Sequence, residues 1–298
     1  MRNSIIAIGL FASAVFAAPN AAPVPQGKGL GGCKKVTLIF ARGTTEMGTM
    51  GSTVGPALQR ALEGKFPGQV KAEGVKYPAD MGGAVSGAIN PSGSEGAKQM
   101  AKMAKEALAA CPDTKIILSG YSQGAEQVHG ALMKTNLGED GAKIAAAITY
   151  GDPMAGPTTK MIGGTWGCLP ESRSRVFCNK GDGVCTGQFS ISAAHLSYTG
   201  NGDINKGAAF AAEIVSKGQL GASPEGCKYG PTGPELQALL CANPPAGKGG
   251  AKGAKGKGGF GALFRRQSKG KGGGTPKLSC PPKDGAAPAA AAPGAGGE

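Results

Sequence analysis

The chain has 298 residues, with 32 basic and 19 acidic side chains and a net charge of +13. Its 54 glycines and 21 prolines make up a quarter of the sequence, about twice the average share, but no three-residue glycine period is present, which excludes collagen. No apolar run reaches the length of about 18 residues that a transmembrane helix needs.

The excess positive charge is concentrated at the C-terminal end of the chain. Ten basic and only two acidic residues lie between Ala242 and Glu298, whereas the preceding sequence is mildly basic. A chain without its first and last segments is only mildly basic, which weakens the case for nucleic-acid binding. We therefore expect no nucleic-acid partner.

The first 17 residues have the features of a secretory signal peptide. Arg2 is followed by an apolar run from Ile5 to Phe16, and Val15-Phe16-Ala17 provides small residues at a cleavage point. Residues 18–32 then form a short linker. The sequence thus predicts a secreted, extracellular protein, in which the eight cysteines, all beyond the cleavage point, form disulfides. No histidine lies near a cysteine at zinc-site spacing, so we expect no metal.

Strand-like and helix-like segments alternate through the middle of the chain. Strands are expected at Val36–Phe40, which is continuously apolar, and at Val70–Tyr77, Lys115–Leu118 and Ile144–Tyr150. Helices are expected at Pro56–Leu62, Ser94–Cys111, Ala125–Lys134 and Ile204–Lys217. This alternation predicts an α/β three-layer sandwich with a central, mostly parallel sheet covered by helices on both faces.

The alternation stops before the C-terminal end. Residues 221–245 form a cysteine-containing extension, and residues 246–298 are a low-complexity tail of Gly, Lys, Ala and Pro. Such a tail cannot bury enough apolar surface to fold, so it is expected to be disordered. A solvated linker is the favoured interpretation, with electrostatic contact to anionic polymers as the alternative and Arg265-Arg266 as a candidate processing site.

The strongest motif is Gly120-Tyr121-Ser122-Gln123-Gly124, which lies between an expected strand and an expected helix. This is the context of a nucleophile elbow, in which a tight turn holds the serine at a helix N-terminus. The flanking glycines are needed because side chains there would collide with neighbouring backbone. Ser122 is therefore the candidate nucleophile.

A nucleophilic serine needs a base, and the chain has two histidines. His129 lies seven residues after Ser122 on the same helix, about 10 Å along its axis, too far to reach the serine. His195 is therefore the candidate base.

A carboxylate between Ser122 and His195 in the sequence is expected to orient the imidazole. Asp152 is a rival because it follows a strand, and Glu126 is expected to lie along the helix flank. We favour Asp182, which a disulfide between Cys178 and Cys185 would hold in a small loop. The other candidates are Glu139, Asp140 and Glu171.

Together these motifs resemble the fungal cutinases, which are secreted serine esterases with the α/β-hydrolase fold. The matching segments span about three-fifths of the chain, from Cys33 to Lys217, and comprise Phe40–Glu46, Gly120–Ala125, Cys178–Gly187 and the His195-Leu196-x-Tyr198 sequence. The resemblance implies a lidless catalytic domain over residues 33–220, a Ser122–His195–Asp182 triad and no cofactor.

The resemblance also implies an oxyanion hole and two disulfides. The oxyanion hole would use the backbone N–H groups of Gln123 and Thr44, with the Thr44 hydroxyl assisting, although the family often has Ser at that position. The implied disulfides are Cys33–Cys111 and Cys178–Cys185. Three pairings remain open for the other cysteines, Cys168, Cys227, Cys241 and Cys280.

The expected activity is hydrolysis of the ester bonds of cutin-like polyesters and of short-chain esters. The enzyme is expected to be a monomer. Val184, Phe189 and Ile191 are candidates to line an acyl-chain groove, with simple loop packing as the alternative. Two other functions remain open: an acetylxylan esterase, and a non-catalytic secreted protein that binds wall polymer through its basic tail.

Overall fold

A computed structural model describes residues 32–156, 164–187, 190–218 and 226–231. The predictions for the signal peptide, Phe189, Cys241, Cys280 and the low-complexity tail lie outside these residues. No helix within the described ranges is long and apolar enough to cross a membrane.

Strands and helices alternate along the described chain. The strands are β1 (Val36–Ala41), β2 (Val70–Gly74), β3 (Lys115–Tyr121), β4 (Ala146–Tyr150) and β5 (Ser174–Phe177). The α-helices are α1 (Val54–Lys65), α2 (Met81–Ile89), α3 (Glu95–Ala110), α4 (Gln123–Leu132) and α6 (Asp203–Ser216).

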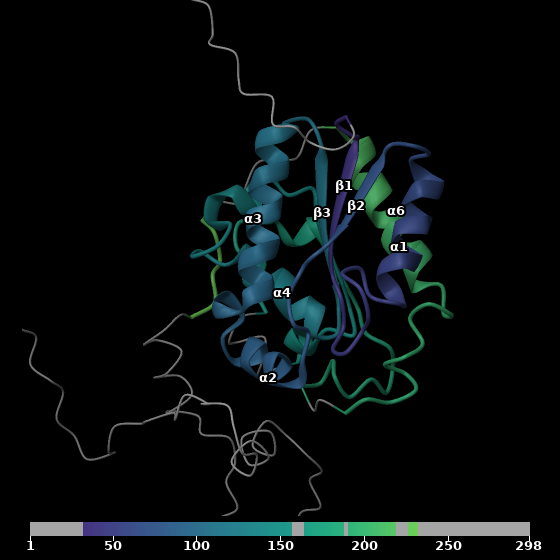
Figure 1. The fold of residues 1–298 in the computed structure, drawn as a ribbon, viewed down its shortest axis with the longest axis vertical. Helices are drawn as coiled ribbons and strands as arrows, with labels where there is room; N and C mark the ends of the chain where they lie inside the picture. The colour runs from purple at the N-terminus through teal and green to yellow at the C-terminus, as the bar shows by residue number, and fades with distance from the viewer. Residues whose placement is uncertain (1–31, 157–163, 188–189, 219–225, 232–298) are drawn as a thin grey trace, which may run out of the picture. The chain divides into compact units, whose positions relative to one another are not determined.

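These strands form one sheet in the order β2-β1-β3-β4-β5, and every neighbouring pair is parallel. Helices α1 and α6 pack together on one face of the sheet, and α3 packs on α4 on the other face (Figure 1). The predicted three-layer sandwich with a parallel centre is therefore confirmed.

Alternating residues of β1, an interior strand of the sheet, pack into the two cores. Leu38 and Phe40 of β1 pack with Leu58 of α1, whereas Ile39 packs with Met100 of α3. Because successive side chains of a strand point to opposite faces, a continuous apolar strand stabilises both helix layers.

Two elements had not been predicted. Helix α2 contains three glycines, which weaken the helical signal, but the Asp80 side chain caps its start by accepting a hydrogen bond from the Gly83 N–H (2.6 Å). Strand β5 is a four-residue edge strand whose Arg175 and Val176 are exposed, so it lacks an apolar pattern.

Two disulfides connect distant segments of this domain. Cys33, before β1, is bonded to Cys111 at the end of α3. Cys168 is bonded to Cys227, which was one of the three partners that the sequence left open for Cys168. The 33–220 boundary remains a prediction, since this second bridge joins the domain to the cysteine-containing extension.

Candidate active site

Ser122 lies in the sharp turn between β3 and α4. Its φ of +55° is a strained backbone conformation for a residue with a side chain. A Cβ at Gly120 would lie 2.1 Å from the Gly124 carbonyl oxygen, and a Cβ at Gly124 would lie 1.9 Å from the Ala41 carbonyl oxygen. The two glycines are therefore required by close backbone contacts, and they allow the turn that presents Ser122.

His195 connects Ser122 to Asp182. Its Nε2 lies 3.0 Å from Ser122 Oγ, and its Nδ1 lies 2.9 Å from Asp182 Oδ2. The ring stacks on Tyr121, with centroids 5.1 Å apart, and the Tyr121 hydroxyl donates to the His195 carbonyl oxygen (2.8 Å). Tyr121 therefore fixes both the backbone and the ring plane of the histidine.

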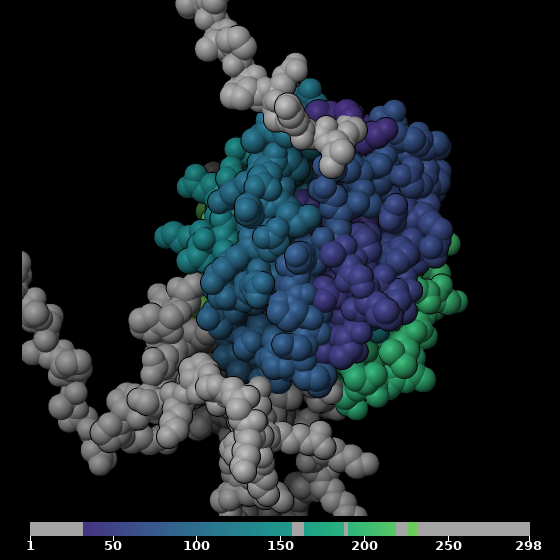
Figure 2. Space-filling model, in the orientation of Figure 1, coloured from purple at the N-terminus to yellow at the C-terminus, as the bar shows by residue number. Residues whose placement is uncertain are grey.

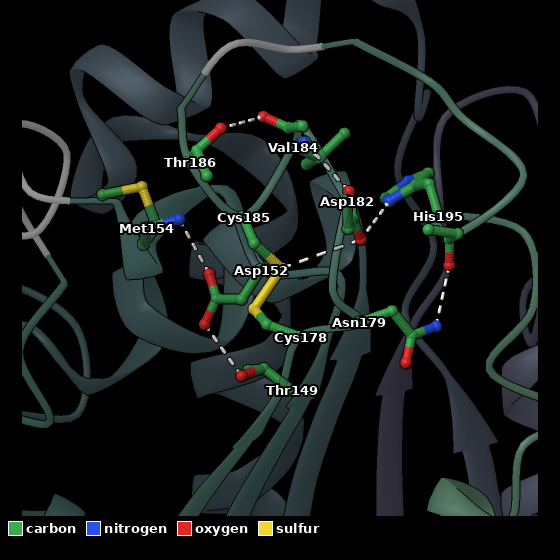
Figure 3. Close-up of a disulfide and its surroundings, with 12 residues drawn as sticks. Thr149, Asp152, Met154, Cys178, Asn179, Asp182, Val184, Cys185, Thr186 and His195 are labelled. Carbon is green, nitrogen blue, oxygen red and sulfur yellow. Dashed lines mark hydrogen bonds and ion pairs between the residues drawn. A yellow bond between two sulfur atoms is a disulfide. The ribbon is translucent and has the colours of Figure 1, made fainter.

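Asp182 lies in a loop closed by the Cys178–Cys185 disulfide (Figure 3). Its Oδ1 accepts from the Val184 N–H (2.9 Å), and its Oδ2 accepts from the Tyr198 hydroxyl (2.6 Å) as well as from His195. Burial alone would raise the pKa of Asp182, but the hydrogen bonds from His195 and Tyr198 outweigh it, so the pKa lies below its ordinary value. The loop thus presents an ionised carboxylate to His195 Nδ1.

Thr44 and Gln123 meet beside the serine. The Thr44 hydroxyl lies 3.0 Å from the Gln123 side-chain amide. All polar neighbours are satisfied when the amide nitrogen donates to Thr44 Oγ1 and to the Asp80 carbonyl oxygen (3.2 Å), while the amide oxygen accepts from the Ala84 N–H (2.9 Å). In this orientation the Thr44 hydroxyl accepts, and its own hydrogen is available to another acceptor.

Glu46 stabilises the loop that carries Thr44, a role that sequence reasoning missed. The Glu46 carboxylate accepts from the Gly43 N–H (2.8 Å) and from the Thr53 N–H (3.0 Å) and hydroxyl (2.6 Å). On the same loop the Arg42 guanidinium donates to the Tyr77 carbonyl oxygen (2.8 Å). Figure 2 shows the segment after β1, in purple, reaching the surface beside the blue segments that follow it.

The candidate substrate-binding residues differ in accessibility. Val184 is buried and Ile191 is exposed. Two further apolar side chains, Met81 at the start of α2 and Leu196 next to His195, are also largely exposed. No signal in the sequence distinguished these two from other apolar residues.

Asp152, the rival for the third catalytic position, pairs instead with His129. Asp152 Oδ2 lies 2.8 Å from His129 Nε2, and both side chains are buried. Only the fold brings these two residues together, since they are 23 positions apart on different elements.

Glu126, which was expected to lie along the helix flank, is buried. It fits against α2 because Gly87 has no side chain: a Cβ there would lie 2.5 Å from Glu126 Oε2. Burial, with a contribution from the negative charge of Asp152, raises the pKa of Glu126 well above its ordinary value. Burial therefore disfavours the ionised form of Glu126.

Serine, imidazole and carboxylate thus form a continuous hydrogen-bonded chain suited to nucleophilic attack on a carbonyl. Within the described ranges, no group of three or more His, Cys, Asp and Glu side chains could hold a metal ion.

Comparisons with known proteins agree on one family. The Cutinase family model matches residues 32–215. The cutinase of Monilinia fructicola is 40% identical over 183 residues, which cover 61% of this chain and 84% of that protein. The cutinase of Botryotinia fuckeliana is 42% identical over 167 residues, covering 56% and 77% respectively.

A solved structure supports the same assignment. Trichoderma reesei cutinase in complex with a phosphonate inhibitor superposes with a TM-score of 0.54 at 34% identity, over 61% of this chain and 77% of that chain. The chain therefore belongs to the cutinase family and is a carboxylic ester hydrolase of the serine esterase type.

Proposed function

We propose that Ser122, His195 and Asp182 form the catalytic triad of this esterase. The observation that carries the proposal is the unbroken chain of contacts, 3.0 Å from Ser122 Oγ to His195 Nε2 and 2.9 Å from His195 Nδ1 to Asp182 Oδ2. Because Asp182 is ionised, the imidazole hydrogen lies on Nδ1, and Nε2 is free to accept a proton from the serine.

In this mechanism Ser122 Oγ attacks the ester carbonyl carbon while its proton passes to His195 Nε2. The tetrahedral intermediate collapses, and the leaving alcohol takes that proton. A water molecule then attacks the acyl-enzyme and transfers a proton to His195. The bond from the acyl carbon to Ser122 Oγ breaks, His195 returns the proton to Ser122 Oγ, and the acid is released.

The oxyanion of the intermediate would be bound by the backbone N–H groups of Thr44 and Gln123 and by the Thr44 hydroxyl. Support comes from the Gln123 amide, whose orientation leaves the hydroxyl hydrogen available to donate. The Glu46 contacts hold the Thr44 loop in place before substrate binds, so little reorganisation is needed during the reaction.

The proposed substrates are cutin-like polyesters and short-chain esters. Exposed Met81, Ile191 and Leu196 favour an aliphatic chain over an acetylated sugar, and Val184 and Phe189 remain candidates for the same groove. We further propose secretion through residues 1–17 and action as a monomer. The proposed route is supported by the apolar run from Ile5 to Phe16 that follows Arg2.

The test is hydrolysis of p-nitrophenyl acetate, butyrate and longer esters, of cutin and of acetylated xylan by the wild type and by Ser122→Ala. We expect turnover with a preference for butyrate over acetate, and loss of turnover in the variant. Ser216→Ala, an exposed serine on α6, is the matched control. Undiminished activity in Ser122→Ala would contradict the triad, and a preference for acetylated xylan would replace the proposed substrate class.

A further inference from the structure

The buried His129–Asp152 pair has no part in the proposed reaction, yet it lies next to the residues that do. His129 is on α4, the helix that begins after Ser122, and its side chain is 2% exposed. Its Nε2 lies 2.8 Å from Asp152 Oδ2, and its Nδ1 lies 3.0 Å from the Thr165 carbonyl oxygen.

These contacts determine the protonation state of the pair. Burial alone would raise the pKa of Asp152, but hydrogen bonds from His129, Thr149 and Met154 help to lower it below its ordinary value, so the carboxylate is ionised. A carboxylate and a carbonyl oxygen can only accept, so both nitrogens of His129 carry hydrogens. His129 is therefore an imidazolium in a buried ion pair.

The pair anchors the turn that follows β4. Besides His129, the Asp152 carboxylate accepts from the Thr149 hydroxyl (2.8 Å) and from the Met154 N–H (2.8 Å), as Figure 3 shows for these last two. Three elements are thus joined at one side chain: the end of β4, the short 3-10 helix Pro153–Ala155, and α4.

The anchored turn contacts both ends of the proposed proton-transfer step. The Tyr150 carbonyl oxygen accepts from the Ser122 N–H (2.9 Å). Gly151 has a φ of +56°, and a Cβ there would lie 2.7 Å from Cε1 of His195. The backbone from Tyr150 to Asp152 therefore limits where the serine and the imidazole can lie.

We propose that the His129–Asp152 ion pair positions Ser122 and His195 by fixing this turn. His129 and Asp152 are positioning residues and touch no substrate. The inference rests on the proposed triad, because it assigns the pair a role in aligning that triad.

A double-mutant cycle of His129→Asn, Asp152→Asn and the double variant tests the proposal. Small displacements of reacting groups cost about 10- to 100-fold in rate, so we expect kcat to fall by that factor while KM stays within about twofold. Because the two residues act as a unit, the double variant should lose less than the product of the single losses.

The control is Arg173→Met. Arg173 is also buried and donates to the Ile144 carbonyl oxygen (2.9 Å), near the start of β4 and away from Ser122. It should lower the melting temperature without lowering kcat. Thr149→Val removes only one hydrogen bond to Asp152, so it provides a milder variant that should lower kcat a few-fold if the larger changes prevent folding.

Two spectroscopic readouts separate alignment from stability. The downfield proton resonance of His195 Nδ1–H should shift in the Asp152 and Thr149 variants but not in Arg173→Met. Trp166, the only tryptophan, lies against His129 with ring centroids 4.2 Å apart and ring planes tilted by 33°, so removal of the imidazolium in His129→Asn should raise its fluorescence.

Unchanged kcat in folded pair variants, or strictly multiplicative losses, would overturn the positioning role. Unchanged fluorescence in His129→Asn would overturn the charged state of His129. Failure of the triad itself is distinguishable, because then Ser122→Ala would remain active.

Discussion

The protein contains two buried histidine–aspartate pairs of nearly equal length. His195 and Asp182 are 2.9 Å apart, and His129 and Asp152 are 2.8 Å apart. All four side chains are almost inaccessible to solvent, and both aspartates have a lowered pKa. Neither distance, burial nor carboxylate charge therefore distinguishes a proposed catalytic pair from a positioning pair.

The difference lies in the group that faces the second imidazole nitrogen. His195 Nε2 faces the Ser122 hydroxyl, which can donate as well as accept, whereas His129 Nδ1 faces the Thr165 carbonyl oxygen, which only accepts. His195 can therefore be neutral and take up a proton, but His129 must keep both hydrogens and cannot act as a base. The group that faces the second ring nitrogen therefore decides the role of each histidine.

Asp182→Asn should produce the largest contrast between the pairs. An amide at this position favours the wrong imidazole tautomer, and we expect kcat to fall by about 10⁴-fold. The measurement is ester hydrolysis at saturating substrate. If the loss is no larger than that of Asp152→Asn, the two pairs are equivalent and the distinction fails.

Thr44→Val should cause the next largest loss of activity. The change keeps the shape of the side chain but removes the hydroxyl donor, so kcat should fall by about 10²-fold or more with little change in KM. Thr44→Ser is the control and should retain most of the activity. Equal activity of the Val and Ser variants would mean that the hydroxyl does not assist.

Tyr198→Phe tests why Asp182 is ionised. The variant loses the hydrogen bond to the charged Asp182 and also the one that the Tyr198 hydroxyl accepts from the Asn179 N–H (3.0 Å). Loss of the bond to the charged group alone should lower the free energy of unfolding by about 1.5–3 kcal/mol at neutral pH. The stability that a lowered carboxylate pKa provides is present above the unfolded pKa and is lost as pH falls through the folded pKa.

The variant raises the folded pKa of Asp182, so part of this contribution is absent at neutral pH and acid unfolding should begin at a higher pH than in the wild type. Urea unfolding between pH 3 and pH 7 measures the effect. If acid unfolding begins at the same pH in the variant and in the wild type, Tyr198 does not stabilise the charged form of Asp182.

Glu126→Gln should have the smallest effect on activity, within about twofold, because Gln keeps the shape of a buried side chain whose ionised form is disfavoured. Its effect on stability depends on pH. A raised folded pKa gives stability that is present below the unfolded pKa and is lost as pH rises through the folded value.

A glutamine does not ionise, so Glu126→Gln does not lose stability in this way as pH rises. The variant should be more stable than the wild type at alkaline pH and similar in stability at pH 5. Urea unfolding at both pH values measures this, with exposed Glu213→Gln as the control. An equal loss of stability at alkaline pH in the wild type and in Glu126→Gln would contradict a raised pKa of Glu126.

Local patterns in the sequence predicted much of the fold and the proposed nucleophile. The apolar strands could be recognised because they are buried on both faces, and the glycines around Ser122 because backbone atoms fill the space where side chains would be. Helix α2 and strand β5 were missed since tertiary contacts, and not local preference, stabilise a glycine-rich helix and a polar edge strand.

The sequence alone determined the sheet, the serine turn and, by the small number of histidines, the candidate base. It favoured Asp182 over Asp152 because of the small loop that a disulfide would close, but it could not show which histidine each aspartate contacts, since these partners lie far apart along the chain. Only the tertiary structure brings His129 to Asp152 and His195 to Asp182. The physical reason is that the role of a histidine depends on the acceptors around both ring nitrogens, and packing between distant segments supplies them.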